Sequence, residues 1–308
     1  EFFFVHEHFT RYLTTTHRRE GSWWSFVPLL LVGLLPWTSA LPWLGRTVYA
    51  DSQRPARILL VAWCGFVLVF FSLSGSKLPS YILPMFPALA LLCAHALRVV
   101  SPAALRRHLL VLVALWVALA AVATTQQGRF VSATTTSQAV SSLALGVAIG
   151  AIFFLCGAAL AWWCLKRDRV TAAVVSIGAA HLIALSIILQ AHDVYGQLRS
   201  SKQIAQLLRA HEGGTEVPVF TVATYDQTLP FYLGRNVVLV DYVDEFALGQ
   251  RLEPSRAMTT LAQFIAQWNE LPRAAAYMKP QTFDEMERAG LRMRVVFRDP
   301  RRVVVTKP

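Results

Sequence analysis

Acidic residues are scarce in the first two thirds of this 308-residue chain. Residues 1–192 contain five Asp and Glu against 14 Lys and Arg, whereas residues 193–308 contain 13 against 15. Charged residues make up only 15% of the chain and hydrophobic residues 55%, which is unusual for soluble domains. The composition therefore predicts a polytopic membrane protein. The net charge of +11 follows the apolar part, so we do not expect nucleic acid as a partner.

Cysteine is also rare, and its placement excludes two kinds of site. All four cysteines lie in apolar runs without metal-ligand spacing, and residues 193–308 contain none. We therefore expect neither a cysteine metal site nor a disulfide in the tail. The chain also lacks an initiating Met and a signal-peptide pattern, and it begins in a stretch already rich in ionisable residues. We expect it to be a fragment of a longer protein.

Long apolar runs are what the chain has in abundance. A bilayer core about 30 Å thick needs roughly 20 apolar residues in helical conformation. Six stretches qualify as transmembrane helices, at about 25–45, 57–75, 79–97, 109–127, 139–165 and 170–192. They divide the chain into a juxtamembrane segment (1–22), a transmembrane region (23–192) and a tail domain (193–308).

Basic residues alternate between the turns that connect these stretches. Nine Lys and Arg lie in the turns 46–57, 98–107 and 166–169, while the turns around Lys77 and Arg129 hold one each. The positive-inside rule places the basic turns in the cytoplasm. Residues 1–22, the turn at Lys77 and the tail are then extracytoplasmic.

The tail has the pattern of a water-soluble domain. Three β-rich runs, at 217–222, 237–242 and 274–278, alternate with predicted helices at 225–233, 258–269 and 283–289. Residues 293–307 read as a hairpin across Asp299-Pro300. This alternation predicts a small α/β domain with a mixed sheet.

Two short stretches on the predicted outer face carry ionisable groups. In "SKLPSY", residues 76–81, Pro79 breaks the helical pattern between Lys77 and Tyr81. Their ammonium and hydroxyl groups are phosphate donors. The alternative is that Lys77 snorkels to the interface and Tyr81 joins an aromatic belt.

The opening "EFFFVHEHFTRY" is the second of these stretches. If it is helical, Glu7 and Arg11 are i,i+4 neighbours, which fits either a solvated ion pair or part of an anion site. Two histidines and a glutamate in three residues are also possible donors to a divalent ion. The H-E-H spacing nevertheless lacks the i,i+4 histidine pair of helical zinc proteases.

These motifs together resemble a known family. The patterns "FFxxxEHFxRY", "FFSxSxSKLPSYILPxxPxLALL" and "TLPFYL", with a closing basic hairpin, are similar to the C-terminal part of bacterial lipid-linked sugar transferases. These are the aminoarabinose (lipid A) transferase-like members of the protein-mannosyltransferase superfamily, with the GT-C fold. The resemblance covers essentially the whole chain. It implies an incomplete GT-C membrane domain of six transmembrane helices, followed by a small extracytoplasmic α/β domain.

The resemblance also implies an activity and a location. Such enzymes move a sugar from a polyprenyl phosphate to an acceptor outside the bacterial cytoplasmic membrane, such as lipid A or another cell-envelope molecule. The tail would then be periplasmic. Arg11 and Tyr81 match positions that contact the donor phosphate, and we assign Lys77 to the same phosphate on chemical grounds. His6, or alternatively His8, matches a position associated with a divalent metal, either zinc or magnesium or manganese.

One departure from the family pattern limits this reading. The family's acidic catalytic residues lie in an outside loop that no segment here matches, so we expect the catalytic carboxylate to be outside this chain. Its partners would be the missing N-terminal half of the enzyme, membrane lipids, the lipid-phosphate donor and the acceptor. Two alternatives stay open: a transporter or flippase for an anionic lipid, and an inactive lipid-binding remnant.

Overall fold

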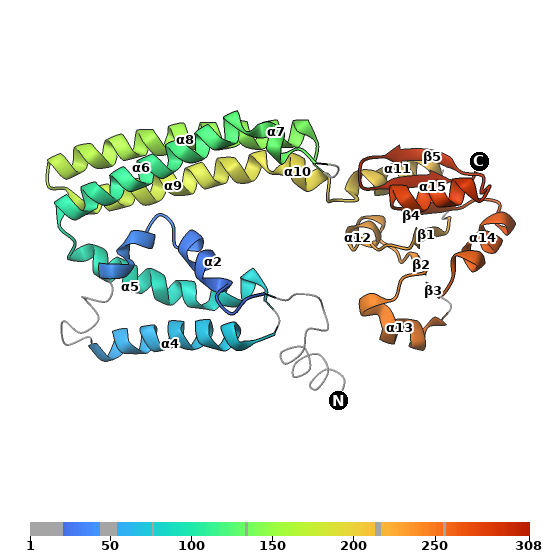
Figure 1. The fold of residues 1–308 in the computed structure, drawn as a ribbon, viewed down its shortest axis with the longest axis horizontal. Coiled ribbons are helices and arrows are strands. Elements are labelled where there is room, and N and C mark those ends of the chain that lie inside the picture. The colour runs from blue at the N-terminus through green and yellow to red at the C-terminus, as the bar shows by residue number, and fades with distance from the viewer. Residues whose placement is uncertain (1–20, 44–53, 76, 133–134, 213–216, 255–256) are drawn as a thin grey trace. The chain divides into compact units, whose positions relative to one another are not determined.

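The computed structural model describes residues 21–43, 54–75, 77–132, 135–212, 217–254 and 257–308. Figure 1 shows the helices and strands of the described residues. Two compact units are distinguished along the chain. One comprises the described residues of Glu1–Ala120 with Ile149–Ser186, and the other comprises those of Ala121–Ala148 with Ile187–Pro308. The first is entirely helical, and the second contains all strands of the sheet.

Five helical segments among the described residues are long and apolar enough to cross a membrane. Their mean hydropathy lies between 1.6 and 2.5, so the chain is a multi-pass membrane protein. The segments are α4 (Arg54–Leu73), η3 (Pro79–Met85) with α5 (Phe86–Arg98), α6 (Pro102–Thr125), α8 (Ser137–Lys166), and α9 (Val170–Ala191) with α10 (Asp193–Gln197). A short helix, α7 (Gln127–Phe130), follows α6.

The predicted span at 25–45 is not one continuous helix. Helix α2 covers Phe26–Gly33, and a separate 3-10 turn, η2, covers Thr38–Ala40. Pro36 lies between them, and it has no backbone N–H with which to continue the helical ladder. The residue before a proline is also biased away from helical conformation. The hydropathy of this stretch met the requirement for a span, but its proline interrupts the helix.

The long helices α8 and α9 pack closely through small residues. A Cβ added at Gly157 would lie 2.3 Å from the Cβ of Ala180, and one added at Gly150 would lie 3.0 Å from the carbonyl oxygen of Ala184. Such close approach of backbones is typical of helix pairs in membranes. Nearby, Trp116 of α6 stacks on Phe154 of α8, with ring centroids 5.3 Å apart.

The basic ends of the helices in the first unit contact one another in pairs. Arg57 Nη1, in the first turn of α4, lies 3.2 Å from His95 Nε2, in the last turn of α5. Arg106, near the start of α6, donates from Nη2 to the carbonyl oxygen of Leu165 at the end of α8, at 3.0 Å. The described basic residues Arg57 and Arg106 therefore lie at the helix ends where α4, α5, α6 and α8 meet in pairs, as the alternation of charge along the chain predicts.

The tail forms a six-stranded mixed sheet, so the prediction of a small α/β domain is confirmed. The spatial order is β3-β2-β1-β4-β6-β5, with β1 to β4 parallel and β6 antiparallel to both β4 and β5. The strands are β1 (Val219–Val222), β2 (Val238–Val240), β3 (Ala257–Met258), β4 (Ala275–Met278), β5 (Arg294–Arg298) and β6 (Val303–Thr306). The helices are α11 (Lys202–Glu212), α12 (Thr228–Leu233), α13 (Ala247–Leu252), α14 (Leu261–Glu270) and α15 (Pro280–Arg288), with a 3-10 turn, η4 (Asp244–Phe246), before α13.

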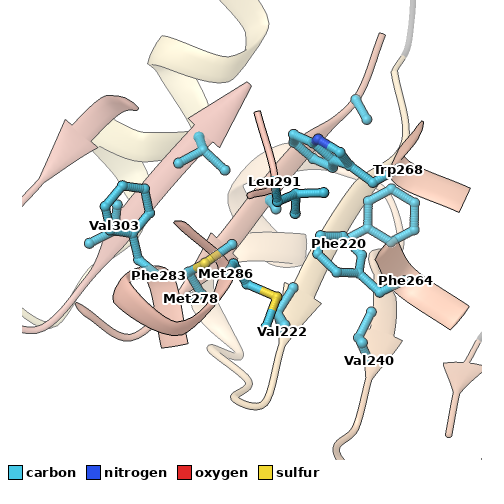
Figure 2. Close-up of a cluster of buried hydrophobic side chains, with 13 residues drawn as sticks. Phe220, Val222, Val240, Phe264, Trp268, Met278, Phe283, Met286, Leu291 and Val303 are labelled. Atoms are coloured by element: carbon cyan, nitrogen blue, oxygen red, sulfur yellow. The ribbon is translucent and has the colours of Figure 1, made fainter. Parts of the chain in front are cut away.

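Both faces of the strands β1, β4 and β6 are buried, which explains their predominantly apolar sequences, whereas the edge strand β5 is partly exposed. On one face, Phe220 of β1 packs with Phe264 and Trp268 of α14, as Figure 2 shows. On the other face, Val219 and Tyr277 pack against residues of α11 and α12. Because side chains alternate along a strand, neighbouring residues of β1 and β4 enter different cores. This sandwich of helices around the sheet fixes the loops at the carboxyl ends of the strands.

Candidate functional site

Lys77 lies at the carboxyl end of α4, and its ammonium group caps that helix. Nζ donates to the carbonyl oxygens of Phe71 at 3.1 Å and Ser72 at 2.7 Å, and also to that of Ser74. The last carbonyls of a helix have no partner within the helix and carry its negative dipole end, so they attract a cation. Burial lowers the pKa of the Lys77 ammonium, whereas the three carbonyl acceptors favour its charged form.

The chain that follows the opening segment lies against this same turn. A Cβ added at Gly21 would be 2.8 Å from Cγ of Lys77, so glycine permits the contact. The Lys77 ammonium also lies 5.7 Å from the centroid of the Phe26 ring, within cation–π range. Residues 21–26 and the Lys77 turn, which are about fifty residues apart in sequence, therefore meet in the structure.

Tyr81 lies one turn further along, in the 3-10 segment η3. Its ring stacks on Phe71 of α4, with centroids 4.7 Å apart and an angle of 29° between the rings. The η3 segment is held to α4 by Trp63, whose Nε1 donates to the carbonyl oxygen of Pro84 at 3.0 Å. Among the described residues, no hydrogen-bond partner for the Tyr81 hydroxyl is found. The stacking on Phe71 thus fixes the orientation of the Tyr81 ring.

The remaining predicted site residues fall outside the described part of the chain. Arg11, His6 and the alternative ligand His8 all lie within residues 1–20. Within the described ranges, no cluster of three or more His, Cys, Asp and Glu could hold a metal ion. The roles of Arg11, Lys77 and Tyr81 at a phosphate, and of His6 or His8 at a metal, stay predictions.

An apolar cavity of about 680 Å³ runs along α5 in the same helical unit. It extends from Phe86 at the start of α5 to Arg98 at its end, with Ala90 and Ala94 on the wall between them. The other walls come from the break after α2 and from the start of α9, at Gly33, Leu34, Leu35, Trp37, Val170, Thr171, Val174 and Val175. Its length along a membrane helix and its apolar lining suit a hydrocarbon chain.

Comparison with known proteins shows which family the fold and sequence of this chain resemble. Residues 204–307 match the family described as the aminoarabinose transferase C-terminal domain. The crystal structure of ArnT from Cupriavidus metallidurans bound to undecaprenyl phosphate superposes with a TM-score of 0.88 and 32% identity, over 99% of this chain and 55% of that one. The chain corresponds to the C-terminal part of an aminoarabinose transferase-like GT-C protein. The family resemblance and the GT-C fold expected from the motifs are thereby confirmed.

Curated relatives agree with this assignment over a shorter segment. The undecaprenyl phosphate-alpha-4-amino-4-deoxy-L-arabinose arabinosyl transferase of Pseudomonas paraeruginosa is 43% identical over 96 residues, which are 31% of this chain and 18% of that protein. The enzyme of the same name from Erwinia tasmaniensis is 40% identical over 95 residues, 30% of this chain and 17% of that protein. The chain spans about half the length of the ArnT chain in the crystal.

Sequence reasoning missed two features of this aminoarabinose transferase-like chain. The first is the set of carbonyl acceptors around Lys77, which a basic residue a few positions after the end of an apolar helix could have indicated. The second is the cavity along α5. Small Ala90 and Ala94, spaced four residues apart, lie on one helical face, but only the packing of neighbouring helices turns such a face into a cavity.

Proposed function

We propose that the chain is the C-terminal portion of a membrane glycosyltransferase. It would move a sugar from a polyprenyl-phosphate donor to an extracytoplasmic acceptor, such as lipid A or another cell-envelope molecule, in the bacterial inner membrane. The observation that carries this proposal is the meeting of residues 21–26 with the Lys77 turn, in a fold shared with ArnT. The curated relatives are named as arabinosyl transferases that act on an undecaprenyl-phosphate sugar.

Chain connectivity supports a phosphate site at this meeting point. Arg11 precedes Gly21 by ten residues, a distance of about 15 Å if helical and at most about 36 Å if extended. Gly21 itself touches Lys77, and Tyr81 follows one turn later. A guanidinium and a phenol hydroxyl within this reach could grip one phosphate group, the first by charge and the second as a neutral donor.

Such a grip would act on the bond that breaks. A glycosyl phosphate separates through an oxocarbenium-like transition state, and the leaving phosphate gains negative charge as the bond lengthens. Donors aimed at that phosphate then stabilise the transition state more than the ground state. The acceptor hydroxyl still requires a carboxylate to take its proton. We propose that this carboxylate comes from the N-terminal half of the same enzyme.

The lipid tail of the donor has a place in the proposal too. The cavity along α5 begins at Phe86, directly after the segment that carries Tyr81. A prenyl chain in this cavity would bury apolar surface at roughly 25 cal/mol per Å². The cavity would orient the donor, and the cations at its outer end would hold its phosphate.

A divalent metal at His6, or at His8, belongs to the same proposal. Imidazole suits zinc, whereas magnesium and manganese prefer oxygen ligands, and Glu7 adds one carboxylate next to both histidines. When bound, such an ion would supply further positive charge near the phosphate. Inductively coupled plasma mass spectrometry of the purified protein and of a His6→Ala, His8→Ala variant would detect it.

A transporter of anionic lipids is less well supported. Ion-coupled transporters place carboxylates inside the membrane, and α4, α5, α6, α8 and α9 contain no Asp or Glu. An inactive remnant would retain the phosphate site and the α5 cavity but would transfer no sugar.

The test is sugar transfer in membranes that contain the natural protein. Arg11→Ala and Tyr81→Phe should each lower the initial rate by about tenfold or more, as expected for loss of one charge-assisted or ligand hydrogen bond. Arg129→Ala and Tyr232→Phe are the matched controls, because both residues are distant from Lys77 in sequence and belong to the other compact unit. Rates equal to those of the controls in both site variants would refute the phosphate assignment.

A further inference from the structure

A second cavity, which is polar and has a volume of about 670 Å³, opens in the tail domain. It lies at the carboxyl ends of β1, β2 and β4, and the residues that follow these strands line it, namely Tyr225, Tyr242 and Lys279. Arg199, Asp226 and Arg301 complete the part of the wall that matters here. None of these residues belongs to the site proposed around Lys77 and Tyr81.

The topology of the sheet makes this the expected place for a ligand. Strand β1 pairs with β2 on one side and with β4 on the other, so the chain leaves β1 towards one half of the sheet and later returns on the other half. In open α/β sheets, ligands bind outside the carboxyl ends of the strands at such a switch point. Ala223 and Asp241, which directly follow β1 and β2, have φ of 51° and 48°, conformations that non-glycine residues rarely adopt outside functional loops.

The charge of the cavity favours an anion. Lys279 is exposed and has no partner among the described residues. Arg199 donates to the Tyr195 hydroxyl at 2.7 Å, and Arg301 donates to the carbonyl oxygen of Leu198 at 3.1 Å, so both guanidinium groups are positioned by neutral acceptors. None of the three cations has a carboxylate partner among the described residues. The adjacent Arg302 differs, because it is buried and paired with Asp299 at 2.7 Å.

The carboxylate of Asp226 does not compete strongly for these cations, because it is already saturated. Its oxygens accept from Thr228 N at 2.8 Å, Thr228 Oγ1 at 2.6 Å, Ser201 Oγ at 2.8 Å and the Tyr277 hydroxyl at 3.1 Å. Asp226 therefore ties α11, α12 and β4 together beneath the cavity. These hydrogen bonds hold one wall of the cavity rigid, and the cations that would contact the ligand lie on its other walls.

Two tyrosine rings add a surface for a flat-faced ligand. Tyr225 and Tyr242 have ring centroids 6.1 Å apart and an interplanar angle of 29°. Phe246 supports Tyr225 edge-on at 4.6 Å. Aromatic faces pack against the C–H face of a sugar ring. The Tyr242 hydroxyl is already engaged, because it donates to Asp244 Oδ2 at 3.3 Å, so the contribution of the tyrosines is their ring faces. A nucleotide fits less well, because no glycine-rich turn follows β1 and α12 is only six residues long.

The cavity is also close along the chain to the end of the last membrane span. Arg199 lies eight residues after Ala191, the last residue of α9, and two residues after the end of α10. Because five of these eight residues are helical in α10, they span less than their fully extended length of about 29 Å, so this wall stays close to the end of the membrane span. We propose that the cavity binds a sugar that carries a phosphate, with Arg199, Lys279 and Arg301 on the phosphate and Tyr225 and Tyr242 on the ring.

This proposal deepens the proposed function in one respect, since such a sugar phosphate is the chemistry of a phosphorylated glycolipid acceptor. Binding is nevertheless measured here without any transfer of sugar. Loss of binding and loss of transfer can therefore be told apart, and each proposal can fail alone.

The experiment uses the full chain in phosphatidylcholine nanodiscs. One arm titrates glucosamine 1-phosphate by isothermal calorimetry, with glucosamine, which lacks the phosphate, as the control. The second arm adds a second set of nanodiscs that contain a glucosamine disaccharide lipid, with or without its phosphates. It measures how much of the tagged chain binds to each kind of nanodisc. Preference for the free compound indicates a soluble ligand, and preference for the phosphorylated lipid indicates a headgroup.

Lys279→Gln is the main variant, because its side chain is exposed and holds no partner that folding requires. It should weaken binding of the phosphorylated probe by about five- to fifteenfold, the scale of one charge-assisted contact. Tyr225→Ala should weaken it as well. Arg288→Gln is the matched control, since it removes the same charge from an exposed position at the far end of α15. Equal weakening in Lys279→Gln and Arg288→Gln, or binding of neither probe, would overturn the proposal.

Discussion

Replacing Asp226 by alanine should destabilise the tail domain more than any surface substitution. The change removes an acceptor shared by four hydrogen bonds and leaves two buried hydroxyls without a partner. These belong to Ser201, which is fully buried, and Tyr277, which is 5% exposed. A buried polar group left unsatisfied costs about 1–3 kcal/mol, so we expect a loss of about 3–5 kcal/mol in the free energy of unfolding. Small domains have only about 5–15 kcal/mol in total.

Hydrogen exchange followed by mass spectrometry can measure this loss in the full chain in detergent. Peptides that cover β1, β4 and α11 should lose protection in Asp226→Ala, whereas peptides from α4 and α5 should not change. Asp284→Ala serves as the control, because Asp284 is exposed and its contact with Arg298 is long, at 3.8 Å. That variant should stay within about 0.5 kcal/mol of the parent. Protection of β1 and β4 that is equal in Asp226→Ala and Asp284→Ala would refute the reasoning.

The same cluster predicts a dependence on alkaline pH. Burial and then the negative charge of Asp226 raise the pKa of Tyr277 well above its ordinary value, while Arg302 and Arg301 act in the opposite direction. The unfolded state therefore releases the phenol proton first, at a pH of about 10. Below this pH the contribution is fully present, and above it stability falls by up to about 1.4 kcal/mol per pH unit. Tyr277→Phe should lack this part of the alkaline loss.

Two further substitutions test the membrane-spanning part. Gly157→Ala should lower stability by about 1–3 kcal/mol in thermal unfolding, because its new methyl group would meet Ala180. Gly65→Ala, which faces open space, should be neutral or slightly stabilising. Equal unfolding midpoints for the two variants would contradict close packing of α8 on α9. Ala94→Trp should fill the cavity along α5 and lower the rate of sugar transfer severalfold at limiting donor concentration. Leu115→Trp, on an exposed face of α6, should leave the rate unchanged. An unaffected rate in Ala94→Trp would contradict the binding of the prenyl chain in this cavity.

Much of this fold follows from local rules that a sequence displays. The apolar spans, the basic turns and the strands at 217–222, 237–242 and 274–278 depend on composition and periodicity within short windows. The stretch 25–45 failed as a single span because hydropathy averages over Pro36, although one proline suffices to end a helix. The two-residue strand β3 and the short helix α13 were not predicted, since segments of this length carry no periodic signal.

The site was harder to predict, because its geometry depends on contacts between distant residues. The spacing of Lys77 and Tyr81 indicated a polar turn at a helix end, and the family resemblance linked it to the opening segment. Neither the spacing nor the resemblance could show that the ring of Phe71 stacks on Tyr81 while the carbonyl oxygen of Phe71 accepts a hydrogen bond from Lys77. The tail cavity was also beyond sequence reasoning, because strand order decides which loops gather at one edge of a sheet.

The three carbonyl oxygens around Lys77 have a consequence for how a phosphate would be recognised. An ammonium group has three protons to donate, and here all three are directed at backbone carbonyls, those of Phe71 and Ser72 in the last turn of α4 and that of Ser74 just after it. Lys77 can therefore contact a phosphate directly only if it releases at least one of these oxygens, so ligand contact and fraying of the last turn of α4 would compete for the same protons. The affinity of Lys77 for a phosphate would therefore depend on whether the last turn of α4 is intact, whereas the affinity of a freely solvated lysine would not.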